Sequence, residues 1–224
     1  MSATLAVVGT PIGNLGDITE RAREILSSVD LVLCEDTRVT RNLLKHIGST
    51  VKMISIHHHS TDEAMRRVLQ QVADGASAAY VSDAGTPGIS DPGGKLVEMA
   101  YAMGIEVLGI PGPSAVATAL SISGFPSDRF LFLGFLPHKK GRETLYQRIA
   151  DAEETVVLYE SPHRILRTLN SLVGLCPNKK VAVCRELTKI HESVVRGTFE
   201  DAIKHYTDHP DQVRGEVVIV ISAK

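Results

Sequence analysis

The fold class is indicated by one segment near the N-terminus, Leu5-Ala6-Val7-Val8-Gly9-Thr10-Pro11-Ile12-Gly13-Asn14-Leu15-Gly16. Its first four residues are apolar, which is typical of a short strand buried on both faces, and they run directly into a turn of glycine and proline. The same combination returns twice: Ala78–Val81 leads into Ser82–Gly94, and Glu106–Ile110 leads through Gly109 into a loop that ends at Ala115. Amphipathic stretches separate these runs. Strands that alternate with helices predict a parallel sheet covered by helices on both faces.

Further apolar runs extend this pattern along the whole chain. We expect strands at Leu31–Cys34, Met53–Ile56, Phe130–Leu133, Thr155–Tyr159, Val181–Cys184 and Val217–Ile221. Glycine and proline at Ser123–Pro126 mark a seam between two halves. The predicted fold class is therefore α/β, with two α/β domains of mainly parallel sheets, residues 1–115 and 116–224. Asp17 and Glu20 predict a capping box, in which Asp17 caps a helix that runs to about Leu26.

The composition bounds the class of protein. The 224 residues include 24 basic and 26 acidic side chains. The net charge of −2 argues against a protein whose whole surface is positively charged for nucleic-acid binding, but it allows local basic faces. Three scattered cysteines predict neither a disulfide framework nor a zinc site, so we expect a reduced, cytoplasmic chain. The sequence opens without a basic leader, and no apolar run approaches the roughly 18 residues of a membrane span, so no membrane partner is expected.

The three glycine-proline loops share one edge of the first predicted sheet. Ligands of open α/β sheets bind at the carboxyl ends of the strands, so we expect a ligand cleft at this edge. A dinucleotide fingerprint and a Walker loop are excluded, because the first loop reads G-x-x-x-G-x-x-G and no G-K-[ST] follows any loop. The loops hold no Lys or Arg before Lys95, whereas Asp83 and Asp91 suit a ligand with cationic or hydroxyl groups. S-adenosylmethionine, which carries a sulfonium, an ammonium and a ribose diol, fits that description.

Eight motifs, in a fixed order, carry a resemblance to a known family. They are Thr10-Pro11-Ile12-Gly13-Asn14-Leu15-Gly16-Asp17-Ile18-Thr19, Glu35-Asp36-Thr37-Arg38, Val81-Ser82-Asp83-Ala84-Gly85-Thr86-Pro87, Pro111-Gly112-Pro113-Ser114, Pro126-Ser127-Asp128-Arg129-Phe130, Tyr159-Glu160-Ser161-Pro162-His163-Arg164, Arg185-Glu186-Leu187-Thr188-Lys189 and Arg214-Gly215-Glu216. Together they resemble the ribosomal RNA small-subunit methyltransferase I family of the tetrapyrrole-methylase superfamily, from about residue 5 to residue 221.

This resemblance implies an activity and a partner. The family uses S-adenosylmethionine to methylate the ribose 2′-hydroxyl of a cytidine in bacterial small-subunit (16S) ribosomal RNA, so the expected partner is that RNA or the assembled small ribosomal subunit. Family members commonly carry a further small C-terminal segment beyond the position of Ile221–Lys224. If that segment helps to grip RNA, we expect a lower RNA affinity for the sequence without it.

The resemblance also implies where the cofactor binds. In the superfamily, S-adenosylmethionine lies folded in the cleft between the two α/β domains, and the protein is a homodimer. Carried over position by position, the cofactor-binding residues are Pro11, Ile12, Asp83, Ala84, Gly85, Thr86, Pro87, Ser114 and Ala115 in the first domain, and Tyr159, Arg185, Glu186, Leu187 and Gly215 in the second.

Charged residues beside the cleft are candidates for catalysis. The 2′-hydroxyl is a poor nucleophile and is helped by a base, or by a cation beside the developing oxyanion. Asp36 or Glu160 could accept the proton, and Lys189 or Arg38 could stabilise the oxygen or hold a phosphate. The alternative is that the first of these clusters is only a capped loop and Arg185–Glu186 a structural ion pair. The sequence does not select a single base.

Three basic clusters are candidate contacts for an RNA backbone. They are Arg38, Arg41 and Lys45; Lys139, Lys140 and Arg142; and His163, Arg164 and Arg167. His57–His59 resembles a metal tract, but neighbouring side chains on a strand end alternate sides, so we expect a polar loop and no metal. Two other functions stay open. One is a C-methyltransferase for a tetrapyrrole such as a cobalamin or sirohaem precursor, and the other is a non-catalytic nucleotide-binding module on ribosomal particles.

Overall fold

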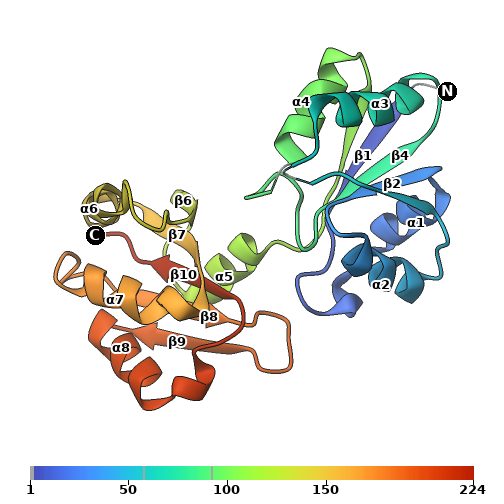
Figure 1. The fold of residues 1–224 in the computed structure, drawn as a ribbon. Coiled ribbons are helices and arrows are strands. Elements are labelled where there is room, and N and C mark those ends of the chain that lie inside the picture. The colour runs from blue at the N-terminus through green and yellow to red at the C-terminus, as the bar shows by residue number, and fades with distance from the viewer. Residues whose placement is uncertain (1–2, 58, 92) are drawn as a thin grey trace. The chain divides into compact units, whose positions relative to one another are not determined.

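The chain folds as two compact units, Met1–Ser114 and Ala115–Lys224 (Figure 1). The computed structural model describes residues 3–57, 59–91 and 93–224. The division comes before helix α5 (Ala115–Ser123), one residue from the expected boundary between residues 115 and 116, and not at the glycine and proline of Ser123–Pro126. Helix α5 packs against strands of the second unit. The glycine and proline therefore mark the end of a helix rather than a domain boundary.

The first unit is a five-stranded sheet in the order β3-β2-β4-β1-β5. All of its pairings are parallel, which confirms the expected α/β class. Its strands are β1 (Thr4–Val8), β2 (Leu31–Cys34), β3 (Lys52–Ser55), β4 (Ala78–Val81) and β5 (Glu106–Ile110). Its helices are α1 (Glu20–Ser28), α2 (Thr37–Ile47), α3 (Asp62–Ala73) and α4 (Gly93–Ala102), with a 3-10 turn η1 (Leu15–Asp17).

Side chains from the two faces of this sheet enter two separate cores. In β2, Leu31 and Leu33 belong to one buried cluster, while Val32 and Cys34 belong to the other. Helices α3 and α4 contribute to the first cluster, and α1 and α2 to the second. Successive residues of a strand point to opposite faces, so a sheet covered on both sides needs apolar residues at every position. This explains the uninterrupted apolar runs of the sequence.

The second unit departs from the expectation of mainly parallel sheets. Its strands are β6 (Phe130–Phe135), β7 (Thr155–Glu160), β8 (Val181–Arg185), β9 (Ser193–Gly197) and β10 (Val217–Ile221), in the order β6-β7-β10-β8-β9. Only β6 and β7 pair in parallel, and the other three pairings are antiparallel. A short connection between β8 and β9 forces an antiparallel pair, because a parallel pair needs a long crossover. Strand β9, which no apolar run in the sequence predicted, alternates between half-buried and exposed residues.

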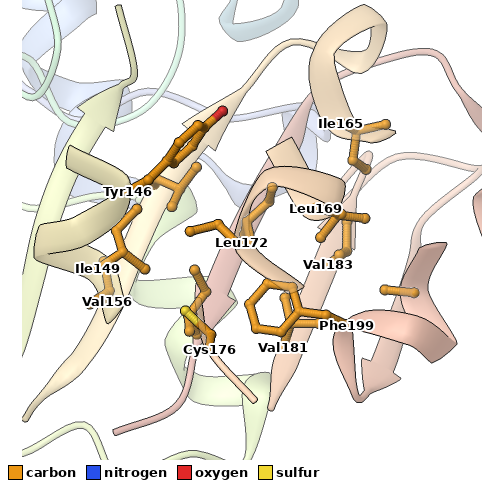
Figure 2. Close-up of a cluster of buried hydrophobic side chains, with 14 of the residues drawn as sticks. Tyr146, Ile149, Val156, Ile165, Leu169, Leu172, Cys176, Val181, Val183 and Phe199 are labelled. Carbon is orange, nitrogen blue, oxygen red and sulfur yellow. The ribbon is translucent and has the colours of Figure 1, made fainter. Parts of the chain in front are cut away.

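Three helices of the second unit cover one face of its sheet. They are α6 (Arg142–Asp151), α7 (Ile165–Val173) and α8 (Phe199–Asp208), and 3-10 turns η2 (Pro162–Arg164) and η3 (Pro210–Gln212) accompany them. Figure 2 shows Ile149 of α6, Leu172 of α7 and Phe199 of α8 meeting Val181 and Val183 of β8 in one buried cluster. Full burial of such a side chain contributes about 1.5–3 kcal/mol. The cluster therefore fixes the framework that carries the ends of β6, β7 and β8.

The first helix begins after the position expected from the sequence. Asp17 ends η1, and α1 begins at Glu20. Thr19 is the N-cap, because its side chain accepts a hydrogen bond from Ala22 N–H at 3.2 Å. The capping box expected at Asp17 is therefore wrong. Over the part of the chain that the structure describes, no helix is long and apolar enough to cross a membrane.

Candidate functional site

The loops that follow β1, β4 and β5 interlock at the carboxyl edge of the first sheet. Thr10 and Gly85 form an antiparallel bridge, in which Thr10 N–H donates to Gly85 O at 2.9 Å and Gly85 N–H donates to Thr10 O at 3.1 Å. Thr86 Oγ1 donates to Pro113 O at 3.1 Å. The loop after β4 is thus bonded to both of the others. The three backbones form one continuous edge, as the sequence predicted.

Glycines make this close approach possible. Gly9 N–H donates to Ile110 O at 3.0 Å, and a Cβ on Gly112 would lie 2.6 Å from the carbonyl oxygen of Gly9. Gly85 has a φ of +80°, and a Cβ there would meet the side chain of Ile12 at 3.3 Å. Larger residues at these positions would push the loops apart. Glycine therefore keeps main-chain groups, rather than side chains, at this edge.

Asp83 joins the loop after β4 to the loop after β2. One of its carboxylate oxygens accepts a hydrogen bond from Asp36 N–H at 2.9 Å, and the residue remains exposed. Asp91, by contrast, serves its own loop. Its two oxygens accept hydrogen bonds from Gly88 N–H and Gly93 N–H, each at 2.7 Å. Of the two aspartates expected to face a ligand, Asp83 is therefore the better placed.

Asp36 is poorly suited to accept a proton. It is the N-cap of α2, with its Oδ1 accepting from Arg38 N–H at 2.8 Å, and its Oδ2 lies 2.6 Å from Arg38 Nη2. The hydrogen bonds from Arg38 lower the pKa of Asp36 to about 2. A carboxylate with so low a pKa is a weak general base near neutral pH. Arg38 itself stays largely exposed, so it can still contact a phosphate.

Glu35, the residue before Asp36, has the opposite character. Burial raises the pKa of Glu35 to about 7, and the negative charges of Asp83 and Asp91 add to this effect. A carboxyl group with such a pKa exchanges its proton near neutral pH, as a general base must. Glu35 was not among the expected site residues. Its environment is made by the loop after another strand, and a sequence pattern gives no signal for that.

Glu160 is a structural residue, so the expectation that it accepts a proton is corrected. Its side chain is inaccessible to solvent and lies between two arginines, with Arg142 Nη2 at 3.1 Å from Oε2 and Arg164 Nη2 at 2.6 Å from Oε1. Thr168 Oγ1 donates to Oε2 at 2.6 Å, and Ser161 N–H donates to Oε1 at 2.8 Å. Both carboxylate oxygens are therefore occupied.

The same contacts correct part of the basic surface expected from the sequence. Arg142 is 2% exposed, and its Nη1 donates to Pro137 O at 3.3 Å. Arg164 Nη1 donates to Leu136 O at 3.0 Å. Neither guanidinium is free for an RNA phosphate, because both neutralise Glu160. Sequence spacing alone could not separate these arginines from their exposed neighbours.

Glu186, at the end of β8, contacts both Lys189 and Gly215. Lys189 Nζ donates to Glu186 Oε1 at 2.8 Å and to Glu216 Oε2 at 3.0 Å. Burial alone would lower the pKa of Lys189, but the hydrogen bonds and charges of the two carboxylates outweigh it and raise the pKa. A Cβ on Gly215 would lie 2.5 Å from the Glu186 carboxyl group. Glu186 and Thr188 have φ values of 53° and 67°, and such strained backbone is typical of functional segments.

The other expected residues of the second unit lie at the same end of its sheet. Val217, where β10 begins, pairs with Glu160 of β7 on one side and with Arg185 of β8 on the other. Tyr159 precedes Glu160, and Leu187 is buried just beyond Arg185. The structure thus brings Tyr159, Arg185, Glu186, Leu187, Lys189 and Gly215 to one end of the second sheet, and Pro11, Ile12, Asp36, Arg38, Asp83, Ala84, Gly85, Thr86 and Pro87 to one edge of the first. Ser114 and Ala115 lie on either side of the division between the units.

The histidine tract falls partly outside the described residues, because His58 is not among them. His59 N–H donates to His57 Nδ1 at 3.2 Å, within a short exposed turn. In the residues that the structure describes, no three His, Cys, Asp or Glu side chains are grouped to hold a metal ion.

Comparison with known proteins gives a family and a set of relatives. Residues 4–203 match the model of the Tetrapyrrole (Corrin/Porphyrin) Methylases. The chain is 47% identical to the ribosomal RNA small subunit methyltransferase I of Synechocystis sp., over 97% of this chain and 78% of the relative. It is 41% identical to the protein of that name from Thermotoga maritima, over 98% of each chain.

Solved structures of low sequence identity share the fold. A diphthine synthase superposes with a TM-score of 0.75 at 15% identity, over 98% of this chain and 90% of that one. A cobalt precorrin-4 methyltransferase of cobalamin biosynthesis superposes with a TM-score of 0.71 at 16% identity, over 98% and 95%. At such identities the likeness extends to the fold alone.

Proposed function

The chain belongs to the tetrapyrrole methylase family. We propose that it methylates the ribose 2′-hydroxyl of a cytidine in bacterial small-subunit (16S) ribosomal RNA, with S-adenosylmethionine as the methyl donor. Relatives with 41% and 47% identity, named ribosomal RNA small subunit methyltransferase I, support this substrate. The observation that carries the proposal is the interlocked edge of glycine-proline loops in the first unit. The loops of this edge hold no Lys or Arg before Lys95 and expose Asp83, so the edge suits a cationic sulfonium better than a phosphate.

The proposed cofactor contacts begin at this edge. Pro11 and Ile12 would border the cofactor, and the free oxygen of Asp83 would accept hydrogen bonds from its hydroxyl or ammonium groups. The remaining proposed contacts are Ala84, Gly85, Thr86, Pro87, Ser114 and Ala115, and from the second unit Tyr159, Arg185, Glu186, Leu187 and Gly215. A tight ion pair would stabilise the sulfonium and oppose transfer, because the charge on sulfur disappears as the methyl group leaves. A pocket of carbonyl oxygens and small residues avoids that penalty.

Methyl transfer is an in-line displacement, so the site must hold the 2′-oxygen about 3 Å from the methyl carbon, in line with the bond from carbon to sulfur. The proton of the hydroxyl must also leave. Glu35 is a better acceptor than Asp36, because its pKa of about 7 is matched to neutral pH whereas that of Asp36 is about 2. Arg38 remains a proposed phosphate contact. Lys189 remains a proposed partner of the developing oxyanion, although two carboxylates already hold it.

The proposed surroundings of the enzyme follow from the same family membership. We expect a homodimer in the bacterial cytoplasm that acts on the ribosomal RNA or on the assembled small subunit. The tetrapyrrole alternative shares the fold and the cofactor. The non-catalytic alternative requires neither methyl transfer nor binding of the donor.

Transfer of radiolabel tests the proposal directly. The purified chain is incubated with methyl-labelled S-adenosylmethionine and either small ribosomal subunits from cells lacking the enzyme or a porphyrinoid acceptor. We expect label on the ribosomal RNA, and mass mapping should place it on a cytidine ribose. Label on the porphyrinoid alone would support the tetrapyrrole alternative. If calorimetry shows that the chain binds neither S-adenosylmethionine nor its demethylated product, the non-catalytic module is supported.

A further inference from the structure

A bulge near the end of β6 changes the side to which Phe135 points. Phe132 pairs with Val157 and Phe135 pairs with Tyr159, so β6 carries one more residue than β7 between these two pairs. Gly134, inside the bulge, has a φ of +58°, in the left-handed region that glycine adopts without strain. One extra residue in a strand moves the following side chain to the opposite face of the sheet.

The bulge brings an aromatic ring to the surface. Regular alternation would send Phe135 to the face of Leu131 and Leu133, which pack on the buried core of the second unit. Instead, its ring is tilted against Tyr159 with the centroids 5.3 Å apart, and Tyr159 makes an edge contact with Phe132 at 5.1 Å. Phe135 is nevertheless 59% exposed. The result is an exposed ring that packs against Tyr159, which in turn contacts Phe132.

The two arginines that pair with Glu160 also bind the backbone that follows Phe135. Arg164 donates a hydrogen bond to the carbonyl oxygen of Leu136, the residue directly after Phe135, and Arg142 donates one to the carbonyl oxygen of Pro137. Both arginines contact the Glu160 carboxylate at the end of β7. The segment after β6 is therefore fixed against η2 and α7.

The cations that border this segment are exposed. They are His138, Lys139 and Lys140 after β6, and His163 and Arg167 in η2 and α7. Lys139, Lys140 and Arg167 form no ion pair among the residues that the structure describes, whereas Lys95, Lys189 and Lys204 are all paired. The stretches 138–141 and 163–167 contain no acidic residue. The positive charge there is not neutralised locally.

We propose that Phe135 and the cations His138, Lys139, Lys140 and His163, which follow the ends of β6 and β7, form an aromatic-basic platform that binds a single-stranded segment of the RNA substrate. An exposed ring stacks on an unpaired base, and the neighbouring cations contact phosphates. A duplex would keep its bases stacked and leave the ring unused, so an unpaired strand fits better. The inference rests on the proposed function for the identity of the RNA. The stacking and the charge contacts depend only on the second unit.

The test measures RNA binding separately from methyl transfer. The probe is a fluorescein-labelled oligocytidine RNA of about 12 nucleotides, and anisotropy titrations run from about 50 to 200 mM salt. Phe135→Ala should weaken binding about 5- to 150-fold and leave the salt dependence unchanged, because it removes one stacked base. Lys139→Ser/Lys140→Ser should reduce the slope of log K against log salt by about 1.4, or about 0.7 for each phosphate contact on a single strand.

Matched controls lie outside the platform. Tyr101→Ala removes an aromatic ring that is 64% exposed in the first unit, and Lys180→Ser/Lys224→Ser removes two exposed charges. We expect both controls to bind RNA like the parent chain. An affinity within about twofold of the parent for Phe135→Ala, or an unchanged salt slope for the double lysine variant, overturns the platform. If Phe135→Ala instead splits a dimer in sedimentation and binds RNA normally, the ring belongs to a contact between copies and the proposal is wrong.

Failure of the platform and failure of the proposed function give different results. If the parent chain methylates small subunits but Phe135→Ala binds the probe normally, the platform is wrong and the proposed function stands. If the parent chain transfers no methyl group to RNA but binds the probe through Phe135, the proposed function is wrong and the platform stands.

Discussion

Replacing Glu160 by glutamine should destabilise the second unit rather than only slow catalysis. The substitution keeps the shape of the side chain but removes the negative charge that faces Arg142 and Arg164. Arg142 is 2% exposed, so water cannot replace the lost partner. Removing one member of a buried ion pair costs about 3–5 kcal/mol. The side chain of Arg164 is 13% exposed and regains some solvation, so we expect a loss of about 4 kcal/mol.

Urea unfolding followed by circular dichroism measures this loss. With a slope of about 2 kcal/mol per molar urea, the midpoint of the second unit should fall by about 2 M. Hydrogen exchange should show the loss of protection in α6 and α7, which carry Arg142 and Thr168. Glu143→Gln, an exposed change one residue from Arg142, is the matched control and should move the midpoint little.

An unchanged urea midpoint would contradict the role assigned to Glu160. If Glu160→Gln unfolds within about 0.3 M urea of the parent chain, the buried contacts do not carry the stability assigned to them. If it also loses methyl transfer while its midpoint is unchanged, Glu160 acts in catalysis after all. A second variant, Thr168→Val, removes two hydrogen bonds of the same network without removing a charge, and should cost about 3 kcal/mol.

Three further changes test the first unit. Gly112→Ala places a Cβ 2.6 Å from the backbone of Gly9 and should cost about 1–3 kcal/mol in thermal unfolding. The control is Gly109→Ala, which has open space around its Cβ and should cost much less. Equal stabilities of the two variants would contradict the close approach of Gly112 to Gly9. The pKa of Glu35 is raised from 4.5 to about 7 in the folded chain. Its contribution to the free energy of unfolding is therefore complete below pH 4.5 and is lost as the pH rises through 7. Between pH 5 and pH 8, the free energy of unfolding of Glu35→Gln should therefore rise by about 1 kcal/mol relative to that of the parent, after allowance for solvent screening. If the two chains show the same dependence of stability on pH, this carboxyl group is not buried. Asp83→Ala should weaken binding of S-adenosylmethionine about 10- to 100-fold in calorimetry without unfolding the chain, and an unchanged Kd would show that Asp83 does not contact the cofactor.

The sheet of the first unit could be predicted because its pattern is local. Runs such as Leu31–Cys34 are apolar at every position, and each strand of a parallel sheet is separated from the next by a helix. The second sheet gave a weaker signal. Its strand β9 has a half-exposed pattern, and β10 pairs between β7 and β8, which precede it in the chain. Pairing order depends on contacts far apart in the sequence, and no short pattern encodes it.

The candidate site divides in the same way. Sequence motifs identified the three loops and Asp83, because glycine and proline impose loop geometry wherever they occur. They did not distinguish Asp36 from Glu35, whose pKa values are about 2 and about 7. That difference comes from Arg38 beside one carboxylate and from burial near Asp83 beside the other.

The α/β class, the glycine-proline edge of the first unit and the family of the protein could all be predicted from the sequence, since they depend on residue types in consecutive positions. The three-dimensional structure was needed to show that Glu160 and Arg142 are buried, that Arg164 pairs with Glu160 and that Phe135 is exposed. The sequence does not show whether a charged side chain faces water or an oppositely charged partner. Its role is set by the dielectric around it and by the groups that other segments bring within a few ångströms.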